Sequence, residues 1–389
     1  MIDISNLRTE THGEWTRLVA DITSDFQRED REDTIWIAVK NENADMLTTD
    51  VYNMFLFYPL YMAMYYKSDL HLHGNVSRQL YQNITTYLQP IMCSFSDDLK
   101  RVNVIVDGYA EAEGSHHMIG SSFSGGVDCL SAIYNHYYKE QHEGSKINAL
   151  FMIIDYDGDE DVRNVFLQLS GKLRKAAAEM KLPLYEIDTN IKVFLHHLVD
   201  RCSFFCIYSC AFAFEKVLKK YYIGSGLSYA ETLKWAAHYR DEDWAGYSDP
   251  YAIPLMESER LKLVIDGCQY TRREKVELIS DWDIAQRYLY VCAGKKSTSN
   301  CGECTKCRRT LLCLDAMGKL EAFSGVFDLE KYRKHAEEYK CSMVLANKRD
   351  LFATDNYQYF VQKGIKLPSW FSARVRTLPK AVMKRLKKG

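Results

Sequence analysis

Four short segments with the pattern of strands alternate with longer helical segments between residues 118 and 224, and this order restricts the fold more than any other feature. The expected strands cover 118–123, 147–154, 184–188 and 221–224, and the expected helices cover 128–138, 162–180 and 203–219. The segment 147–154 is apolar throughout, as in a strand with both faces covered. The alternation predicts an α/β protein with a doubly wound parallel sheet wrapped by helices on both sides. Ligands of such sheets bind at the edge where the carboxyl ends of the strands meet.

The rest of the chain predicts two further parts. Residues 1–112 mix expected strands and helices up to the polar link 107–117, which predicts an N-terminal α+β domain. Residues 113–322 contain the alternating pattern, and residues 323–389 predict a helical C-terminal extension. The 50 Lys and Arg residues nearly balance the 52 Asp and Glu residues, which excludes a uniformly basic protein that coats nucleic acid. An apolar content of 47% excludes disorder along most of the chain.

A glycine-rich turn, residues 124–129 (SGGVDC), follows the first expected strand of the parallel sheet. Its adjacent glycines, Gly125 and Gly126, allow a backbone with positive φ to approach an anion without a Cβ clash. The next helix begins near Asp128, so its free N–H groups and the positive end of its dipole face the same anion. Asp128 itself has two interpretations that stay open, a Mg²⁺ ligand beside phosphates or an N-cap of the helix. The turn lacks the ending of a Walker loop.

Four cysteines near the end of the second part have the spacing of a metal site. They follow the pattern C-x8-C-x2-C-x2-C and are Cys292, Cys301, Cys304 and Cys307. Four thiolates can surround one tetrahedral ion, and the two short spacings form a zinc knuckle. Structural zinc is the first interpretation, and an iron–sulfur cluster, which also takes four cysteines, is the alternative. Among the other cysteines, Cys129 and Cys268 are the candidates for reactivity.

The glycine-rich turn resembles the PP-loop of the ATP pyrophosphatases, whose pattern is SGGxDS or SGGxDT at the end of the first strand. Together with the cysteine spacing, residues 113–322 resemble 7-cyano-7-deazaguanine synthases, and Pro254-Leu255 and the run TRREK at 271–275 are further matching fragments. The resemblance implies a doubly wound sheet of the HUP type, with ATP, Mg²⁺ and Zn²⁺ as cofactors. It implies an ATP site made of Phe123, Ser124, Gly125, Gly126, Val127, Asp128 and Cys129. Asp155, just after the second strand, and Arg308 are further candidates from their position and charge, and a solvated surface charge is the alternative for Arg308 and for Lys275. Ser124, Asp128 and Lys275 are the implied catalytic residues, and the four cysteines are the implied zinc ligands.

The resemblance also implies a reaction. Such enzymes adenylate a carboxylate with ATP, release pyrophosphate and then transfer nitrogen, which predicts an ATP-dependent carbon–nitrogen ligase with a small-molecule acceptor. Residue 2 is Ile, which excludes a glutaminase with an N-terminal nucleophile, so the nitrogen is expected from ammonia, an amine or a partner glutaminase. The sequence departs from the family at Cys129, where a Ser or Thr is usual, and at residues 224–231, where the acceptor segment of the family is missing. The identity of the acceptor therefore stays open.

Two other functions stay open at this point. An ATP-dependent sulfur transferase, acting on RNA or a small molecule, would require Cys129 or Cys268. A non-catalytic nucleotide-binding module is favoured by the weaker hydrogen-bond donor at Cys129, because a thiol replaces a hydroxyl there.

Two observations bear on partners and location. The stretch 374–389 carries seven Lys and Arg residues without an acid, which favours either contact with a membrane or nucleic acid or a solvated helix face. The longest apolar stretch, 54–66, is too short to cross a bilayer and predicts a buried helix. With no signal peptide and clustered cysteines, the sequence predicts a cytoplasmic protein.

Overall fold

The computed structural model describes residues 1–28, 30, 32–154, 160–194, 199–235, 248–292 and 297–377, with the backbone alone for 199–204 and 235. The chain divides into two compact units. Unit 1 consists of Met1–Ser124 and Asp128–Gln269, and unit 2 consists of Gly125–Val127 and Tyr270–Gly389. These limits differ from those expected at 112 and 322, and the independent folding of the three expected parts stays a prediction.

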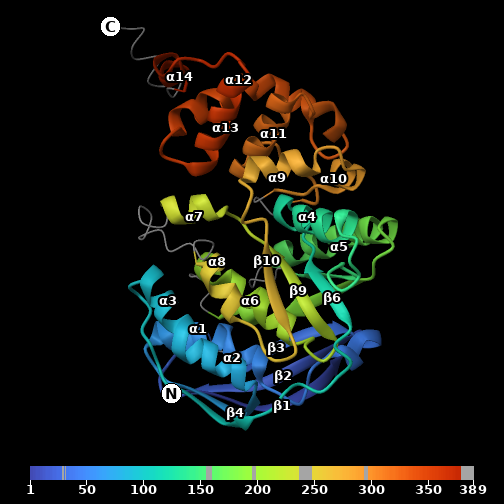
Figure 1. Cartoon of the computed structure of the whole chain (residues 1–389), viewed down its shortest axis with the longest axis vertical. Coiled ribbons are helices and arrows are strands. Elements are labelled where there is room, and N and C mark those ends of the chain that lie inside the picture. The colour runs from blue at the N-terminus through green and yellow to red at the C-terminus, as the bar shows by residue number, and fades with distance from the viewer. Residues whose placement is uncertain are drawn as a thin grey trace. The chain divides into compact units, whose positions relative to one another are not determined.

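Unit 1 is built on one mixed, mostly parallel sheet, which has ten strands within the described ranges (Figure 1). The strands follow one another in space in the order β10-β9-β6-β7-β8-β3-β2-β1-β4-β5. Their bounds are β1 (Ile2–His12), β2 (Trp15–Ser24), β3 (Thr34–Lys40), β4 (Leu70–Val76), β5 (Val104–Tyr109), β6 (Met118–Ser122), β7 (Ala149–Ile153), β8 (Leu184–Thr189), β9 (Leu218–Gly224) and β10 (Lys262–Asp266). The α/β class expected from the sequence is confirmed.

The five strands β6 to β10 are parallel and form the expected nucleus of the sheet. Numbered along the chain from one to five, they lie in space in the order 3-2-1-4-5. The order reverses between β6 and β9, so this is the switch point at which doubly wound sheets open a crevice for ligands. In Figure 1, α4 and α5 lie on one side of β9 and β10, and α6 and α8 lie on the other.

The helices of unit 1 connect or cover these strands. Their bounds are α1 (Tyr58–Tyr66), α2 (Arg78–Asn83), α3 (Gln89–Phe95), α4 (Val127–Ile133), α5 (Glu160–Glu179), α6 (Val199–Phe212), α7 (Tyr229–Trp235) and α8 (Asp249–Ala252). Most of the apolar stretch 54–66 is buried, as expected, but it forms the 3₁₀ turn Asn53–Leu56 followed by α1 rather than one helix. Phe57, just before α1, and Tyr61 pack on Phe212 and Phe205, with ring centroids 4.8 and 5.4 Å apart. Within the described residues, we find no helix that is both long and apolar enough to cross a membrane.

The N-terminal strands extend the same sheet rather than forming another. β3 pairs antiparallel with β8, where Ile37 lies opposite Thr189 and Val39 lies opposite Ile187. β2 and β1 then continue the sheet antiparallel, and β4 and β5 follow in parallel. One sheet therefore runs through both the expected α+β domain and the expected parallel domain.

A carboxyl group is buried in unit 1, at Glu215. Its side chain is fully buried and accepts hydrogen bonds from Asn53 Nδ2 at 2.7 Å and from the hydroxyl of Ser258. Burial raises the pKa of Glu215 from 4.5 to about 7, against the opposing effect of these two donors. Removal from water disfavours the charged carboxylate, so the folded state favours the protonated form of Glu215.

We expect the stability of unit 1 to fall as the pH rises from 4.5 to about 7, the window between the unfolded and folded pKa values of Glu215. In that window the folded state keeps a proton that the unfolded state has lost. Above the window, the free energy of unfolding is lower by up to about 3 kcal/mol. Urea unfolding between about pH 5 and about pH 8 measures this slope. Glu215→Gln is expected to flatten it, whereas Glu143→Gln, at an exposed glutamate, serves as the control. An unchanged slope in Glu215→Gln would contradict the assignment.

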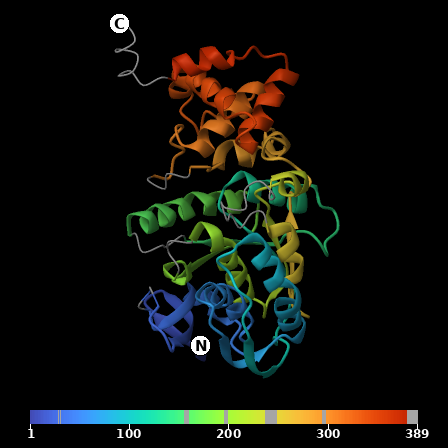
Figure 2. The same ribbon diagram turned by 90° about the vertical axis from the view of Figure 1, so that its left-hand side faces the viewer.

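Unit 2 is helical throughout its described residues, apart from loops (Figure 2). Its helices are α9 (Arg272–Ile279), α10 (Asp283–Tyr288), α11 (Thr305–Met317), α12 (Leu329–Ala346), α13 (Leu351–Gln362) and α14 (Trp370–Arg376). Side chains satisfy free N–H groups at several N-termini: Thr271 and Glu274 form a capping box on α9, and Asp328 and Asp350 cap α12 and α13. The expected helical extension is thus present up to residue 377.

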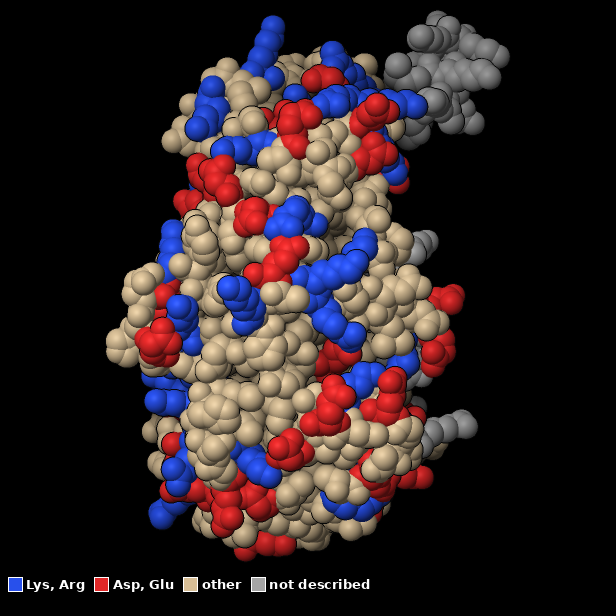
Figure 3. Space-filling model, turned by 90° about the vertical axis from the view of Figure 1, so that its right-hand side faces the viewer, with Lys and Arg blue, Asp and Glu red and all other residues tan. Residues whose placement is uncertain are grey.

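Charged side chains of both signs are interspersed over much of the face drawn in Figure 3, in keeping with a net charge of −2. Of the basic stretch 374–389, Arg374 and Arg376 belong to the described α14, and Arg376 lies 3.3 Å from Glu337. The part of the stretch beyond residue 377 lies outside the described residues, so its contact with a membrane or nucleic acid stays a prediction.

Candidate nucleotide-binding loop and metal centre

The glycine-rich turn leaves the sheet at the carboxyl end of β6. The N–H of Phe123 still donates to the carbonyl of Phe151 at 2.7 Å, and the chain then turns away from the sheet. Gly125 has a φ of 74°, a value that side-chain-bearing residues adopt only with strain. α4 begins two residues later and continues without a break into the π-helical turn Tyr134–Lys139. A strand, a tight glycine turn and a helix N-terminus therefore follow one another, as the sequence predicted.

The start of α4 packs directly on the neighbouring strand β9. A Cβ atom on Gly224, the last residue of β9, would lie 2.4 Å from the carbonyl oxygen of Asp128 and 2.9 Å from the amide nitrogen of Cys129. These separations are shorter than van der Waals contact, so only glycine fits there. β9 and β6 flank the switch point, and the start of α4 is thus fixed beside it.

We expect Gly224→Ala to displace the first turn of α4 and, if the turn binds a nucleoside triphosphate as predicted, to weaken that binding. Because the added carbon meets backbone atoms, which cannot rotate away, the cost is expected to be about 1–3 kcal/mol of stability. Gly171→Ala in α5 is the matched control, because its added Cβ meets no atom within 4 Å. The substitution also replaces a glycine in the interior of a helix. That variant is expected to gain about 0.5–1 kcal/mol. Thermal melting and calorimetry with ATP measure both effects, and equal behaviour of the two variants would contradict the packing argument.

The side chains of the loop differ in accessibility. Ser124 is exposed, whereas Phe123, Val127 and Cys129 are buried. The Cys129 Sγ atom lies 3.6 Å from Ser124 Oγ, so the thiol faces the hydroxyl rather than solvent. Asp128 is partly buried, and its carbonyl accepts a hydrogen bond from Ser131 Oγ at 2.9 Å. Because α4 begins at Val127, Asp128 lies inside the first turn, and the expected N-cap role is wrong. The roles of Ser124 and Asp128 toward ATP and Mg²⁺ stay predictions.

The four cysteines converge, as their spacing predicted. The sulfur atoms of Cys292, Cys301, Cys304 and Cys307 all lie within 4.8 Å of one another, and those of Cys301 and Cys307 are 3.9 Å apart. Two thiolates bound to one tetrahedral zinc ion, at about 2.3 Å each, are separated by about 3.8 Å. The cluster can therefore hold a metal ion such as zinc. An iron–sulfur cluster would hold the four sulfurs farther apart, because its irons and sulfides occupy the space between them.

The local backbone geometry positions the sulfur atoms of these cysteines. Gly302 turns the chain with a φ of 75°, and the N–H groups of Glu303 and Cys304 point at Cys301 Sγ, at 3.4 and 3.2 Å. Cys304 is the N-cap of α11, and its sulfur accepts from the N–H of Cys307 at 3.5 Å. N–H donors stabilise the charged thiolate form that binds metal. The knuckle thus consists of a sharp turn at Gly302 followed by α11, which Cys304 caps.

Within unit 2, the cysteine segment is connected to the glycine-rich turn. The N–H of Tyr290, two residues before Cys292, donates to the carbonyl of Gly125 at 2.8 Å. The Tyr290 hydroxyl donates to the carbonyl of Ser297 at 2.9 Å, and burial, with the nearby thiols, raises the pKa of Tyr290 to about 12. The side chain of Asn300 binds the same segment. Its Oδ1 accepts from the N–H of Val291 at 2.8 Å, and its Nδ2 donates to the carbonyl of Leu289 at 2.9 Å. Nothing in the sequence pattern pointed to Tyr290 or Asn300.

The remaining predicted site residues lie as follows. Lys275 is fully buried on α9, and its part in catalysis stays a prediction. Arg308 lies on α11, with its guanidinium 4.8 Å from the ring centroid of Tyr339. It lines a cavity of about 250 Å³ with Arg309, Leu312 and other residues of α11, α12 and α13. Its predicted contact with ATP is untested, and Asp155 lies outside the described residues.

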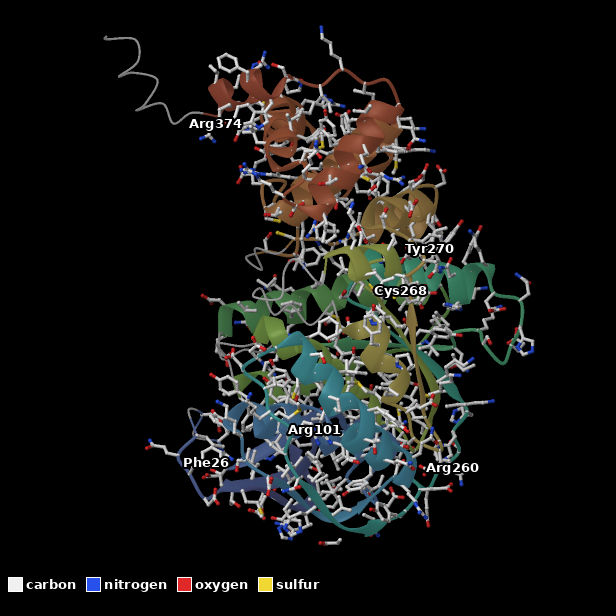
Figure 4. All side chains as sticks on the ribbon, turned by 60° about the vertical axis from the view of Figure 1, so that its left-hand side comes forward. Phe26, Arg101, Arg260, Cys268, Tyr270 and Arg374 are labelled. Carbon is white, nitrogen blue, oxygen red and sulfur yellow. The ribbon has the colours of Figure 1, made fainter. Side chains whose placement is uncertain are left out.

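The second candidate for reactivity, Cys268, lies just beyond the carboxyl end of β10 and is labelled in Figure 4. Its side chain is only 1% exposed, and Cys129 is only 5% exposed. Both thiols are therefore screened from solvent in this structure.

Comparisons with protein-family models, with curated proteins and with solved structures found no match to this chain.

Proposed function

We propose that this chain is an ATP-dependent ligase that adenylates a carboxylate or carbonyl oxygen of a small acceptor and then transfers nitrogen to it. The observation that carries the proposal is the position of the glycine-rich turn. It follows the first strand of a 3-2-1-4-5 sheet at the switch point, with Gly125 at positive φ and α4 starting directly behind it. Amide N–H groups at the start of a helix, beside such a turn, suit a polyphosphate. The proposal also rests on the resemblance of SGGVDC to the PP-loop.

In the proposed reaction, an oxygen of the acceptor attacks the α-phosphorus of ATP, and the bond from that phosphorus to the bridging oxygen of the β-phosphate breaks. Pyrophosphate leaves with that electron pair, and an acyl adenylate remains. Ammonia or an amine then attacks the activated carbon, and AMP leaves as the second product. Ser124 and the amides of the turn would hold the pyrophosphate, and Lys275 is the proposed cationic partner. Mg²⁺, when bound at the Asp128 carboxylate, would offset the charge of the leaving group.

In this proposal the four cysteines bind a structural zinc ion. All four positions around a tetrahedral ion are filled by thiolates, which leaves no open position for a substrate or water. The ion would instead hold the segment that contains Tyr290, whose N–H contacts the Gly125 carbonyl. We propose a cytoplasmic enzyme that takes its nitrogen from ammonia, an amine or a partner glutaminase.

A direct test is to incubate the zinc-loaded protein with Mg²⁺, ammonium and ATP labelled at the α-phosphate, together with a panel of small carboxylic acids. Formation of labelled AMP with release of pyrophosphate supports the proposal, and ADP as the product contradicts it. Exchange of labelled pyrophosphate into ATP detects the adenylation step without the nitrogen donor. ATP binding by calorimetry without turnover or exchange on any acceptor favours the non-catalytic nucleotide-binding module instead.

The sulfur transferase stays the second candidate, because Cys129 is the last residue of the proposed phosphate-binding turn. The burial of Cys129 and Cys268 speaks against it, since a sulfur-carrying cysteine must meet a sulfur donor. Cys129→Ser separates the two candidates. It restores the usual hydroxyl of the PP-loop and is expected to keep ligase turnover, whereas it would abolish sulfur transfer through that residue.

A further inference from the structure

Four polar side chains gather on one face of the sheet of unit 1, on three neighbouring strands away from the glycine-rich turn. They are Asp3 on β1, His71 and His73 on β4, and Asp107 on β5. Asp3 is the register partner of His71, and His73 follows two residues later on the same face. The alternate residues are apolar and fully buried on the opposite face, and they are Ile2, Ile4, Leu70 and Leu72. The strand register therefore brings these four side chains together.

The polar atoms of this group converge. Asp3 Oδ1 lies 3.0 Å from His73 Nε2 and 3.5 Å from His71 Nδ1. The other ring nitrogen of His71, Nε2, lies 3.5 Å from Asp107 Oδ1. The two imidazole rings lie side by side, with centroids 3.8 Å apart. Asp3, His71 and His73 each offer one ligand atom, and these three atoms all lie within 4.8 Å of one another.

The residues around His71 suit a bound cation. Each of its ring nitrogens faces a carboxylate oxygen, but a neutral imidazole has only one N–H to donate. In a neutral ring the other nitrogen would then direct a lone pair at a carboxylate, and a metal ion between the two would relieve this contact. The 3.5 Å separations are also longer than an ordinary hydrogen bond of about 2.7–3.2 Å. They leave room for an ion at one nitrogen and for a carboxylate that orients the ring at the other.

We propose that Asp3, His71 and His73 bind one divalent transition-metal ion of the Zn²⁺ class, with Asp107 as the hydrogen-bond acceptor that orients His71. Two ligands of a tetrahedral zinc ion, a nitrogen and an oxygen at about 2.0–2.2 Å, are about 3.4 Å apart, close to the distances from Asp3. Imidazole with carboxylate suits such an ion. A metal-bound histidine usually donates its other N–H to a carboxylate, as His71 can to Asp107.

Three protein ligands leave a position on the ion for water or another ligand, unlike the four-cysteine cluster. The side chains of His71 and His73 are 22% and 41% exposed, so the ion can exchange with solvent. The proposed site uses none of the residues of the proposed ligase reaction. It therefore stands whether or not that reaction is correct.

The test uses the full chain without a polyhistidine tag and with zinc already in the four-cysteine cluster. Calorimetric titration with ZnCl₂ at neutral pH is expected to show one further equivalent bound by the wild type. This equivalent is expected to be lost in His71→Ala and in His73→Ala. Asp107→Asn is expected to weaken it by about 10–100-fold, the usual effect of removing a group that orients a ligand. His117→Ala, at another accessible histidine of unit 1, is the matched control and is expected to bind like the wild type.

A second measurement identifies the ligands. Co²⁺ added to the zinc-loaded protein is expected to give d–d absorption without a sulfur-to-cobalt charge-transfer band, because nitrogen and oxygen bind it. Circular dichroism checks that each variant is folded, which is expected because the substituted side chains reach solvent. A wild type that takes up no second equivalent would overturn the proposal. Equal losses in His71→Ala and His117→Ala would overturn it as well.

Discussion

Asp128→Ala is expected to lower the release of pyrophosphate from ATP by at least about 100-fold, the usual effect of removing one group that stabilises developing charge. The carboxylate is expected to bind Mg²⁺ beside the phosphates, and alanine cannot replace it. The readout is the rate of AMP and pyrophosphate formation, or of pyrophosphate exchange into ATP.

Asp128→Asn tests whether the charge of this residue is required. Asparagine has nearly the shape of aspartate but lacks the charge that attracts Mg²⁺. If the Asp128 carboxylate binds Mg²⁺ in the reaction, the Asn and Ala variants are expected to be equally inactive. Asp161→Asn, at an exposed carboxylate near the start of α5, is the control and is expected to retain full turnover. Wild-type turnover in Asp128→Asn would contradict a role of the carboxylate in the reaction.

Cys307→Ala is expected to release the metal ion and to unfold part of unit 2. Cys307 is fully buried and provides one of four sulfurs, and structural zinc contributes apparent binding energies of about 10–16 kcal/mol in small domains. Loss of the ion would also release the segment of Tyr290, whose N–H holds the Gly125 carbonyl, so turnover is expected to fall with metal content. Elemental analysis measures the zinc, and hydrogen exchange of residues 289–317 measures the local unfolding.

Cys313→Ala is the matched control for this experiment. Cys313 is buried in the same helix, α11, but its sulfur faces the carbonyl of Arg273 at 4.0 Å rather than the cluster. This variant is expected to retain its zinc and to lose only about 1 kcal/mol. Identical behaviour of Cys307→Ala and Cys313→Ala, with zinc retained in both, would show that the four sulfurs do not share an ion.

The parallel half of the sheet was predictable because its signals are local. β7 is a short apolar run before a helix-length segment, because burial on both faces removes polar residues from it, and β8 directly follows that segment. β1 escaped prediction because one of its faces is exposed and polar, and because it contains a bulge near Asn6, which has a φ of 56°. β10 is only five residues long with a lysine at its start, too short for a clear pattern. The helix expected over 203–219 ends at Phe212, and β9 begins earlier than expected, at Leu218.

The candidate site was predictable to different degrees for the same reason. The knuckle cysteines lie within one short stretch, so their spacing alone indicated their convergence, and the order of strand, glycines and helix indicated the turn. The contact of Tyr290 with Gly125 joins residues far apart in the chain, and neither residue type signals it. Asp3 and His71 are likewise separated in the chain, and only the pairing of β1 with β4 brings them together. Pairings of this kind follow from topology, which a single sequence does not encode locally.

The antiparallel pairing of β3 with β8 has a practical consequence for anyone who trims this chain. A truncated polypeptide that starts at residue 113 would keep all five parallel strands but leave the outer side of β8 bare. Unpaired amides and carbonyls along a strand recruit strands from other molecules. Such a fragment is expected to form insoluble assemblies when expressed, and fusion of a surrogate hairpin to β8 should restore its solubility.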